Sequence, residues 1–146
     1  MATVAMEILE WAPEYALDIP EIDREHQDWF EVINRLHAAM LDGKGPAYLR
    51  TVFAEVAKFS FAHFAHEEEL MVAANYPGYW DHVQRHNELR ETGRAFLKRF
   101  ENGEFTVSIE VMQVLSRAIV EQILTADRPM GDYMKTHGPA AASARR

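Results

Sequence analysis

Residues 51–89 read TVFAEVAKFSFAHFAHEEELMVAANYPGYWDHVQRHNEL. On both sides of the Tyr76-Pro77-Gly78 segment, apolar residues and histidines recur at intervals of three and four residues. Such spacing aligns side chains along one face of an α-helix, and a Pro-Gly pair is typical of a turn. We therefore predict two helices joined by a short connection, which makes them antiparallel neighbours.

Long stretches that are almost free of glycine and proline extend this pattern over most of the chain. Short segments rich in these residues separate four such stretches, which are Glu21–Asp42, Ala47–Tyr76, Tyr79–Asn102 (interrupted by Gly93) and Glu104–Arg128. We predict an all-α fold, an antiparallel up-down-up-down four-helix bundle, in one domain over residues 1–146. Residues 1–19 are expected to form an N-terminal arm, and residues 138–146 a flexible tail.

The composition excludes several classes of protein. The chain contains 23 Asp or Glu against 15 Lys or Arg, which gives a formal net charge of −8. Because an acidic chain without a basic cluster repels polyanions, we expect binding neither to nucleic acid nor to membranes. No cysteine is present, so any metal ligands must be imidazole or carboxylate groups. No apolar run has the length of a signal peptide or a membrane span, and we expect a cytoplasmic protein.

Histidines occupy positions on the predicted helix stripes where apolar residues are expected. These are His26, His63, His82 and His86, on three different helices. Burying an imidazole costs free energy unless its nitrogen atoms are satisfied, and a single buried histidine is usually a hydrogen-bonded core residue. Four buried histidines at the same level of a bundle instead indicate that they bind one common ligand.

Two carboxylates complete this set. Glu67 follows His63 by four residues, which puts both side chains on one helix face, and Asp127 lies near the corresponding end of the fourth helix. Imidazole-rich ligation with carboxylates suits iron, with zinc, manganese or cobalt as alternatives. Six ligands are too many for one ordinary ion, so we predict two ions bridged by Glu67 and Asp127. Paired Glu-x-x-His motifs of the ferritin type do not occur.

The order of the motifs is specific. They are IDREHQ (22–27), HFAHEEEL (63–70), YP (76–77), HVQRH (82–86) and ILTAD (123–127). From about Trp11 to Tyr133, the chain resembles the hemerythrins, in particular the single-domain bacteriohemerythrins of bacteria. The resemblance implies a non-haem di-iron centre that binds dioxygen, or another small diatomic ligand, reversibly at one iron.

Carried over by position, the resemblance gives each residue a role. His26 and His63 would ligate the iron that takes dioxygen, and His82 and His86 the other iron. Glu67 and Asp127 would bridge the two ions together with an oxo or hydroxo group. By the same resemblance, Ile123 would line the dioxygen pocket.

The chain departs from the family pattern at two positions on the fourth helix. The family places a fifth histidine five residues before the bridging aspartate, where this chain has Gln122. Gln122 follows Leu115 by seven residues, so we expect it to face the site, but glutamine is a weaker ligand for iron than imidazole. Four residues earlier, where the family often has tryptophan, Ala118 predicts a roomier wall.

Other polar residues near the motifs are expected to play smaller parts. His66 is expected at the edge of the site or as a partner of a ligand. His37 lies roughly 16 Å from His26 along the helix axis and is too distant to join the site. His137 is expected in the solvated tail, and Glu68 and Glu69 on a charged face.

Three functions remain open from the sequence. The leading hypothesis is a dioxygen-binding protein for storage, delivery or sensing, not an enzyme. The second is a di-iron peroxidase, oxidase or nitric-oxide-handling enzyme, because the position of Gln122 leaves one iron short of a nitrogen ligand. The third is metal storage. The sequence identifies neither a protein partner nor an oligomeric state.

Overall fold

The computed structural model describes residues 7–104 and 106–137. In this part of the chain, long helices account for most of the residues. The elements, in order, are a 3₁₀ turn η1 (Pro13–Tyr15), α1 (Pro20–Leu41), α2 (Pro46–Ala73), α3 (Tyr79–Glu101), α4 (Ile109–Gln122), a π-helical turn η2 (Ile123–Asp127) and α5 (Arg128–His137).

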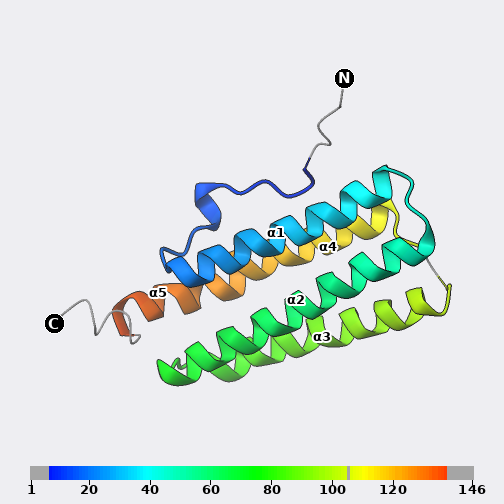
Figure 1. Ribbon diagram of the computed structural model, residues 1–146. Coiled ribbons are helices and arrows are strands. Elements are labelled where there is room, and N and C mark those ends of the chain that lie inside the picture. Colours follow the sequence, from blue (N-terminus) through cyan, green and yellow to red (C-terminus); the bar gives the residue numbers. More distant parts are fainter. Residues whose placement is uncertain (1–6, 105, 138–146) are drawn as a thin grey trace.

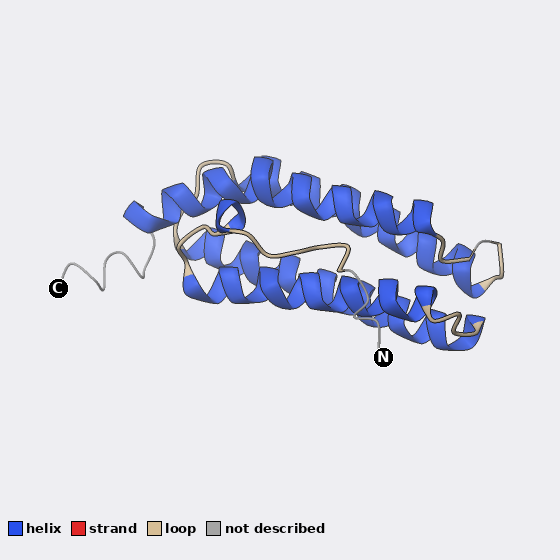
Figure 2. Cartoon of the chain, turned by 90° about the horizontal axis from the view of Figure 1, so that it is seen from above, coloured by secondary structure: helices blue, strands red, loops and turns tan. Residues whose placement is uncertain are grey.

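The four long helices lie side by side with nearly aligned axes, and sequential helices run in opposite directions (Figure 1). Helix α2 packs against both α1 and α3, and α1 also contacts α4, while the view from above shows the connections at the two ends (Figure 2). The predicted antiparallel bundle is therefore confirmed. Among residues 7–104 and 106–137, no helix is both long enough and apolar enough to cross a membrane.

Local chemistry explains where the helices begin. Pro20 and Pro46 stand at the first positions of α1 and α2, where a missing N–H and a fixed φ are favourable. The hydroxyl of Ser108 accepts a hydrogen bond of 3.2 Å from the backbone N–H of Val111 and caps α4. Before α3, a Cβ atom at Gly78 would lie 2.8 Å from Cζ of Tyr76, so a larger residue here would displace the ring of Tyr76.

The fourth helix differs from the prediction at both ends. It begins at Ile109 instead of Glu104, because the backbone of Ser108 is extended and the residue before it, Val107, is buried. It also continues past Asp127 through η2 into α5 and ends at His137. His137 is therefore the exposed last residue of a helix, where its ring stacks on Tyr133 at 4.4 Å between centroids.

The N-terminal segment packs along the bundle. Leu9 and Leu17 are buried, and the Asn34 side chain forms hydrogen bonds with the backbone N–H and carbonyl of Leu9 at 3.0 and 2.8 Å. The guanidinium of Arg128 donates to the carbonyl of Ala16 at 3.0 Å. These contacts fix the segment against α1 and α5. Residues 1–6 of the predicted arm and the whole predicted tail, 138–146, lie outside the described residues.

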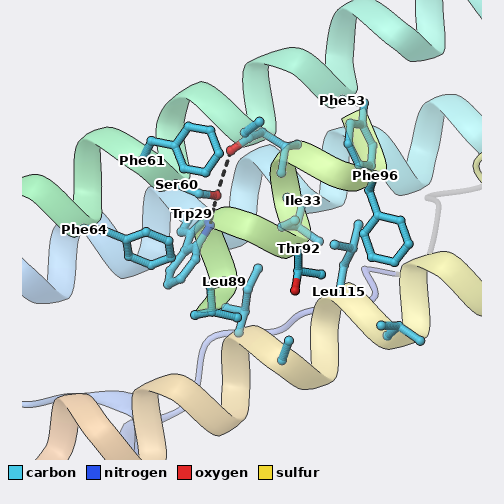
Figure 3. Close-up of a pocket in the computed structure, with 16 residues that line it drawn as sticks. Trp29, Ile33, Phe53, Ser60, Phe61, Phe64, Leu89, Thr92, Phe96 and Leu115 are labelled. Carbon is cyan, nitrogen blue, oxygen red and sulfur yellow. Dashed lines mark hydrogen bonds between the residues drawn. The ribbon is translucent and has the colours of Figure 1, made fainter. Parts of the chain in front are cut away.

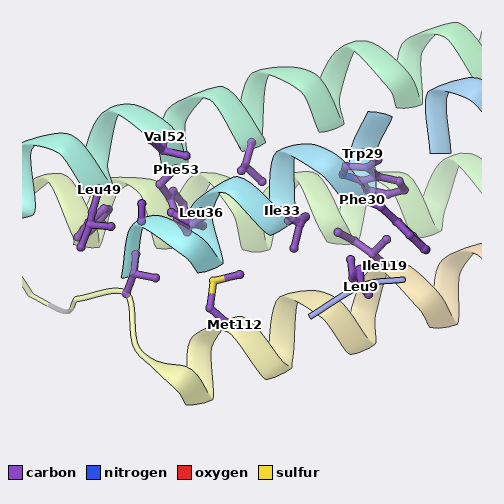
Figure 4. Close-up of a cluster of buried hydrophobic side chains, with 14 of the residues drawn as sticks. Leu9, Trp29, Phe30, Ile33, Leu36, Leu49, Val52, Phe53, Met112 and Ile119 are labelled. Atoms are coloured by element: carbon purple, nitrogen blue, oxygen red, sulfur yellow. The ribbon is translucent and has the colours of Figure 1, made fainter. Parts of the chain in front are cut away.

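The interior of the bundle divides into an apolar half and a polar half, and a smaller apolar cluster that includes Ile22, Met71 and Met130 also belongs to the polar half. Trp29 lies between the two, and its indole N–H donates to the hydroxyl of Ser60 at 2.8 Å (Figure 3). On one side of Trp29, aliphatic and aromatic side chains such as Ile33, Leu36 and Met112 fill the space between the helices (Figure 4). On the other side, the interior contains the histidines.

Candidate metal centre

The six side chains predicted as ligands meet at the end of the bundle where α1 and α3 begin. All are at most 3% exposed. They come from α1 (His26), α2 (His63 and Glu67), α3 (His82 and His86) and η2 (Asp127). The structure thus brings together every histidine and carboxylate that the sequence indicated. Ligand atoms of these residues form two overlapping groups of four, each compact enough to surround one ion.

Glu67 lies between the two pairs of histidines and presents a different oxygen atom to each. Its Oε2 lies 3.3 Å from Nε2 of His26 and 3.2 Å from Nε2 of His63. Its Oε1 lies 3.5 Å from Nε2 of His82 and 3.0 Å from Nε2 of His86. One carboxylate therefore faces two separate groups of imidazoles.

Asp127 divides its oxygen atoms in the same way. Oδ2 lies 3.1 Å from Nε2 of His26, and Oδ1 lies 3.0 Å from Nε2 of His82. We name the two groups by their first residue. The His26 set contains His26, His63, Glu67 Oε2 and Asp127 Oδ2, and the His82 set contains His82, His86, Glu67 Oε1 and Asp127 Oδ1.

The His26 set contains buried polar atoms without hydrogen bonds. Among the described residues, five buried side-chain atoms have no hydrogen-bond partner: Nδ1 and Nε2 of His26, Nε2 of His63, Oε2 of Glu67 and Oδ2 of Asp127. Four of these five are the atoms of the His26 set that face one another. An unsatisfied buried polar atom costs about 1–3 kcal/mol, so their concentration at one point needs an explanation. A cation surrounded by these lone pairs would satisfy all four, and the residues therefore fit a metal ion.

A carboxylate outside the sets fixes the orientation of His63. Oε1 of Glu25 lies 2.7 Å from Nδ1 of His63, which directs Nε2 of this ring towards Glu67. The other oxygen of Glu25 contacts Nδ1 of His66, whose side chain is about one third exposed. His66 thus contacts Glu25 and not a ligand, which places it at the edge of the site, and it does not enter either set.

A second carboxylate does the same for His86. Oε2 of Glu68 lies 2.8 Å from Nδ1 of His86, and Arg90 donates two hydrogen bonds to Glu68, at 2.7 and 3.0 Å. The expectation that Glu68 belongs to a charged face was wrong. Buried metal-binding histidines need an acceptor at the second nitrogen, and acidic residues adjacent in sequence to the ligands were the available signal for Glu25 and Glu68.

The charges in the centre shift the pKa values of its members. Burial alone lowers the pKa of His63, but Glu67 and Glu25 raise it to about 10. Burial is likewise outweighed at His82, where Asp127 and Glu67 raise the pKa to about 9. Burial tends to raise the pKa of Glu67, yet the surrounding histidines, His63 first, hold it well below its usual range. Without metal, the centre therefore holds protons, which metal binding must displace.

Gln122 is buried and directed at the His82 set. Its Nε2 donates to Oδ1 of Asp127 at 3.3 Å and lies 3.5 Å from Nε2 of His82. In an α-helix, residues five positions apart differ in direction by about 140°. The π turn η2, in which Arg128 N–H bonds to the Ile123 carbonyl, allows Gln122 and Asp127 to meet. This turn was not predicted from the sequence, although the five-residue spacing of two inward-facing residues indicated it.

The other predicted positions lie apart from the two sets. Ile123 is fully buried and belongs to the same apolar cluster as Trp29 and Ile119. His37 is partly buried on α1 and is a member of neither set. The fold and these residues define the class of protein, a helical bundle with a candidate dinuclear metal centre in its polar half.

Comparisons with known proteins agree with this class. The family model described as Hemerythrin HHE cation binding domain matches residues 17–130. A bacteriohemerythrin of Stenotrophomonas maltophilia (strain R551-3) is 33% identical over 132 residues, which cover 90% of this chain and 85% of that protein. One from Pseudomonas aeruginosa (strain LESB58) is 33% identical over 127 residues, covering 87% and 82% of the two chains. The chain belongs to the hemerythrin family.

Solved structures support the fold independently. A crystal structure of wild-type hemerythrin covers 87% of this chain and 98% of its own, with a TM-score of 0.82 and 21% identity. A hemerythrin mutant has a TM-score of 0.84 at 22% identity, covering 88% and 98%. At such identities the likeness concerns the fold alone.

Proposed function

We propose that this protein binds dioxygen at a non-haem di-iron centre and serves in oxygen storage, delivery or sensing. In this proposal, the His26 set holds one iron ion and the His82 set the other. Glu67 and Asp127 would each provide one oxygen to each ion, and an oxo or hydroxo group would complete the centre. The observation that carries the proposal is the division of both carboxylates, each of which directs one oxygen to each set.

The chemistry of the ligand atoms supports iron as the metal and dioxygen, an uncharged molecule, as what it binds. Four imidazoles and two carboxylates suit iron among the divalent ions, and the relatives at 33% identity are named bacteriohemerythrins. When bound, ferrous ions would supply the electrons for reversible binding of dioxygen. The protein's part is to keep the ligands dry and oriented. Burial of all six side chains and of Ile123 excludes water, and Glu25 and Glu68 fix two of the rings.

We also propose that the His82 set lacks a ligand that members of the family possess. Gln122 stands at the position expected for a fifth histidine, and its amide nitrogen donates to Oδ1 of Asp127. An amide N–H group has no lone pair for a metal. In this orientation Gln122 would support the Asp127 carboxylate and would not provide a nitrogen ligand to the second iron.

Dioxygen binding is tested on protein loaded anaerobically with ferrous iron. Alternating exposure to dioxygen and vacuum is expected to change the visible spectrum reversibly, over several cycles. His37→Ala is the matched control, because His37 lies on α1 outside both sets, and it should behave like the unchanged chain. Irreversible oxidation in the first cycle would contradict the oxygen-binding role. Slow metal exchange without any response to dioxygen would indicate metal storage instead.

A second candidate function is that of a di-iron peroxidase, oxidase or nitric-oxide-handling enzyme. The orientation of Gln122 favours it, because an open position on the second iron would admit peroxide. Rapid consumption of hydrogen peroxide that falls on Gln122→His would support this function. Equal consumption by both proteins would count against it.

A further inference from the structure

Arg90 follows His86 by four residues on α3, so both side chains lie on one face of the helix. Its guanidinium donates from both terminal nitrogen atoms to Glu68, at 2.7 Å to Oε2 and at 3.0 Å to Oε1. Such a two-point contact between planar groups fixes the direction of the carboxylate as well as its distance. The pair therefore links α3 to α2 beside the His82 set.

The Arg90–Glu68 pair is more sheltered than an ordinary surface ion pair. The two side chains are 14% and 20% exposed, whereas Arg35 and Glu55, which also form an ion pair, are 60% and 51% exposed. Exposed pairs restrain their side chains weakly, because water and salt screen the attraction. Arg90 also donates to the side-chain oxygen of Asn87 at 3.0 Å, which further fixes its position.

Arg90 contacts two groups that hold the ring of His86. Oε2 of Glu68 accepts from Arg90 and lies 2.8 Å from Nδ1 of His86. The ring of Phe64 stacks on His86 with 4.4 Å between centroids, and the Arg90 guanidinium lies 5.5 Å from the centroid of Phe64. One side chain thus restrains both the neighbour at the edge of the imidazole and the neighbour on its face.

The carboxylate that orients a ring of the His26 set has a different outer partner. Glu25 contacts His63 with one oxygen and His66 with the other. The side chain of His66 is about one third exposed, and an imidazole lacks the paired N–H groups that allow a two-point contact. The restraint by arginine therefore belongs to the His82 half of the centre.

We propose that Arg90 is a positioning residue for the ion of the His82 set and acts on His86 through Glu68. The inference rests on the proposed function, because it needs an ion in this set. By fixing Glu68, Arg90 keeps a proton of His86 on Nδ1 and directs the lone pair of Nε2 at the metal. Without Arg90, Glu68 is free to turn away, and the ring of His86 loses the acceptor that orients it.

Release of zinc from the fully loaded protein into excess chelator measures this role without requiring dioxygen. Arg90→Ala should release the ion of the His82 set up to about tenfold faster, the lower end of the range for partners of metal-binding histidines. Glu68→Ala identifies which release step belongs to this set. Arg90→Lys keeps the charge but not the two-point contact, so it should accelerate release less.

Arg94→Ala is the matched control. Arg94 lies four residues further along α3, and its guanidinium lies 5.2 Å from the centroid of Phe61. This variant therefore removes an arginine beside an aromatic ring of α2 but leaves the contact with Glu68. Both release steps should keep the rates of the unchanged chain.

Two further measurements separate positioning from a general effect on stability. In a Glu68→Ala background, Arg90→Ala should add little to the release rate, because residues that act through one another are not additive. In the zinc-loaded protein, the ¹H–¹⁵N NMR signal of the His86 Nδ1–H group should shift in Arg90→Ala. The same signal should stay in place in Arg94→Ala.

The outcomes distinguish this inference from the proposed function. Unchanged zinc release from Arg90→Ala would overturn the inference, and so would an equal effect of this substitution with and without Glu68. Absence of an ion from the His82 set of the unchanged chain would overturn both. If Arg90→Ala accelerated zinc release while the ferrous protein failed to bind dioxygen reversibly, the proposed function would fail and the role of Arg90 would stand.

Discussion

The two halves of the metal centre satisfy their buried polar atoms in different ways. In the His26 set, all four inward atoms lack a hydrogen bond. In the His82 set, Nε2 of His86 bonds with Oε1 of Glu67 at 3.0 Å, and Gln122 approaches both Asp127 and His82. Similar donors thus form one set whose inward atoms lack hydrogen bonds and one that is partly satisfied by hydrogen bonds within the protein.

The difference indicates which site should hold metal more tightly. An ion entering the His26 set displaces protons from His26 and His63, but it satisfies four buried atoms that lack a hydrogen bond. An ion entering the His82 set must replace the His86–Glu67 bond and gains no nitrogen from Gln122. We therefore expect the second ion to be bound more weakly and lost first.

The largest effect is expected from removing the shared bridge. Glu67→Ala deletes an oxygen ligand from both sets, so the chain should no longer retain two ions. Metal analysis after gel filtration measures the loss. Glu69→Ala, an exposed member of the same acidic run, serves as the control and should keep both ions. Two ions per chain in Glu67→Ala would contradict a bridging role.

The outer carboxylates test the two halves separately. Loss of a partner that orients a metal-binding histidine typically lowers metal affinity by about 10- to 100-fold. Glu25→Ala should weaken the ion of the His26 set, and Glu68→Ala that of the His82 set. Competition titrations with a chelator would resolve the two steps. If both variants weakened the same step, the assignment of histidines to separate ions would be wrong.

Gln122→His should reduce the difference in metal affinity between the His26 set and the His82 set. An added imidazole gives the His82 set a further nitrogen ligand, and we expect its ion to leave roughly tenfold more slowly in excess chelator. The rate for the first ion should change little, which provides an internal control. If the second ion left at an unchanged rate, Gln122 would already provide the ligand that histidine was expected to add.

A smaller effect is expected on the way the stability of the metal-free chain depends on pH. The pKa values of His63 and His82 are raised from the usual 6.5 to about 10 and about 9. Their protonated forms therefore stabilise the fold fully below pH 6.5, and this contribution is lost as pH rises through 9 to 10. In the metal-loaded chain the imidazoles are neutral, so no such loss is expected above pH 6.5.

Denaturant titrations of both forms across this range measure the contrast. Subtracting the loaded form removes effects of lysine and tyrosine titration common to both. Parallel pH profiles for the free energy of unfolding would mean that the histidines are not ion-paired with Glu67 and Asp127 in the metal-free protein.

Much of the fold followed from the distribution of glycine and proline and from helical spacing. Those patterns predict α1, α2 and α3 within a few residues because each helix is bounded by a Pro or Gly. The fourth helix was predicted less well. The helix begins later than predicted because Val107 is buried, and it continues past Asp127 through η2. Both features depend on tertiary packing, which no local sequence pattern shows.

The candidate site was predicted at the level of ligands but not of their partners. His26, His63, His82 and His86 stood out because polar residues occupied apolar positions. Glu25, Glu68 and Arg90 did not, since acidic and basic residues on helices are usually solvated and only the fold shows which lie against a histidine. The cytoplasmic location and the single-domain boundaries remain predictions.

We propose that two ions occupy inequivalent halves of one bridged centre. Mössbauer spectroscopy of the protein reconstituted with ⁵⁷Fe, combined with iron analysis, tests it most directly. We predict two iron ions per chain and two quadrupole doublets of equal area with different parameters, from spins coupled through the bridge. One iron per chain, or two uncoupled ions, would contradict the account.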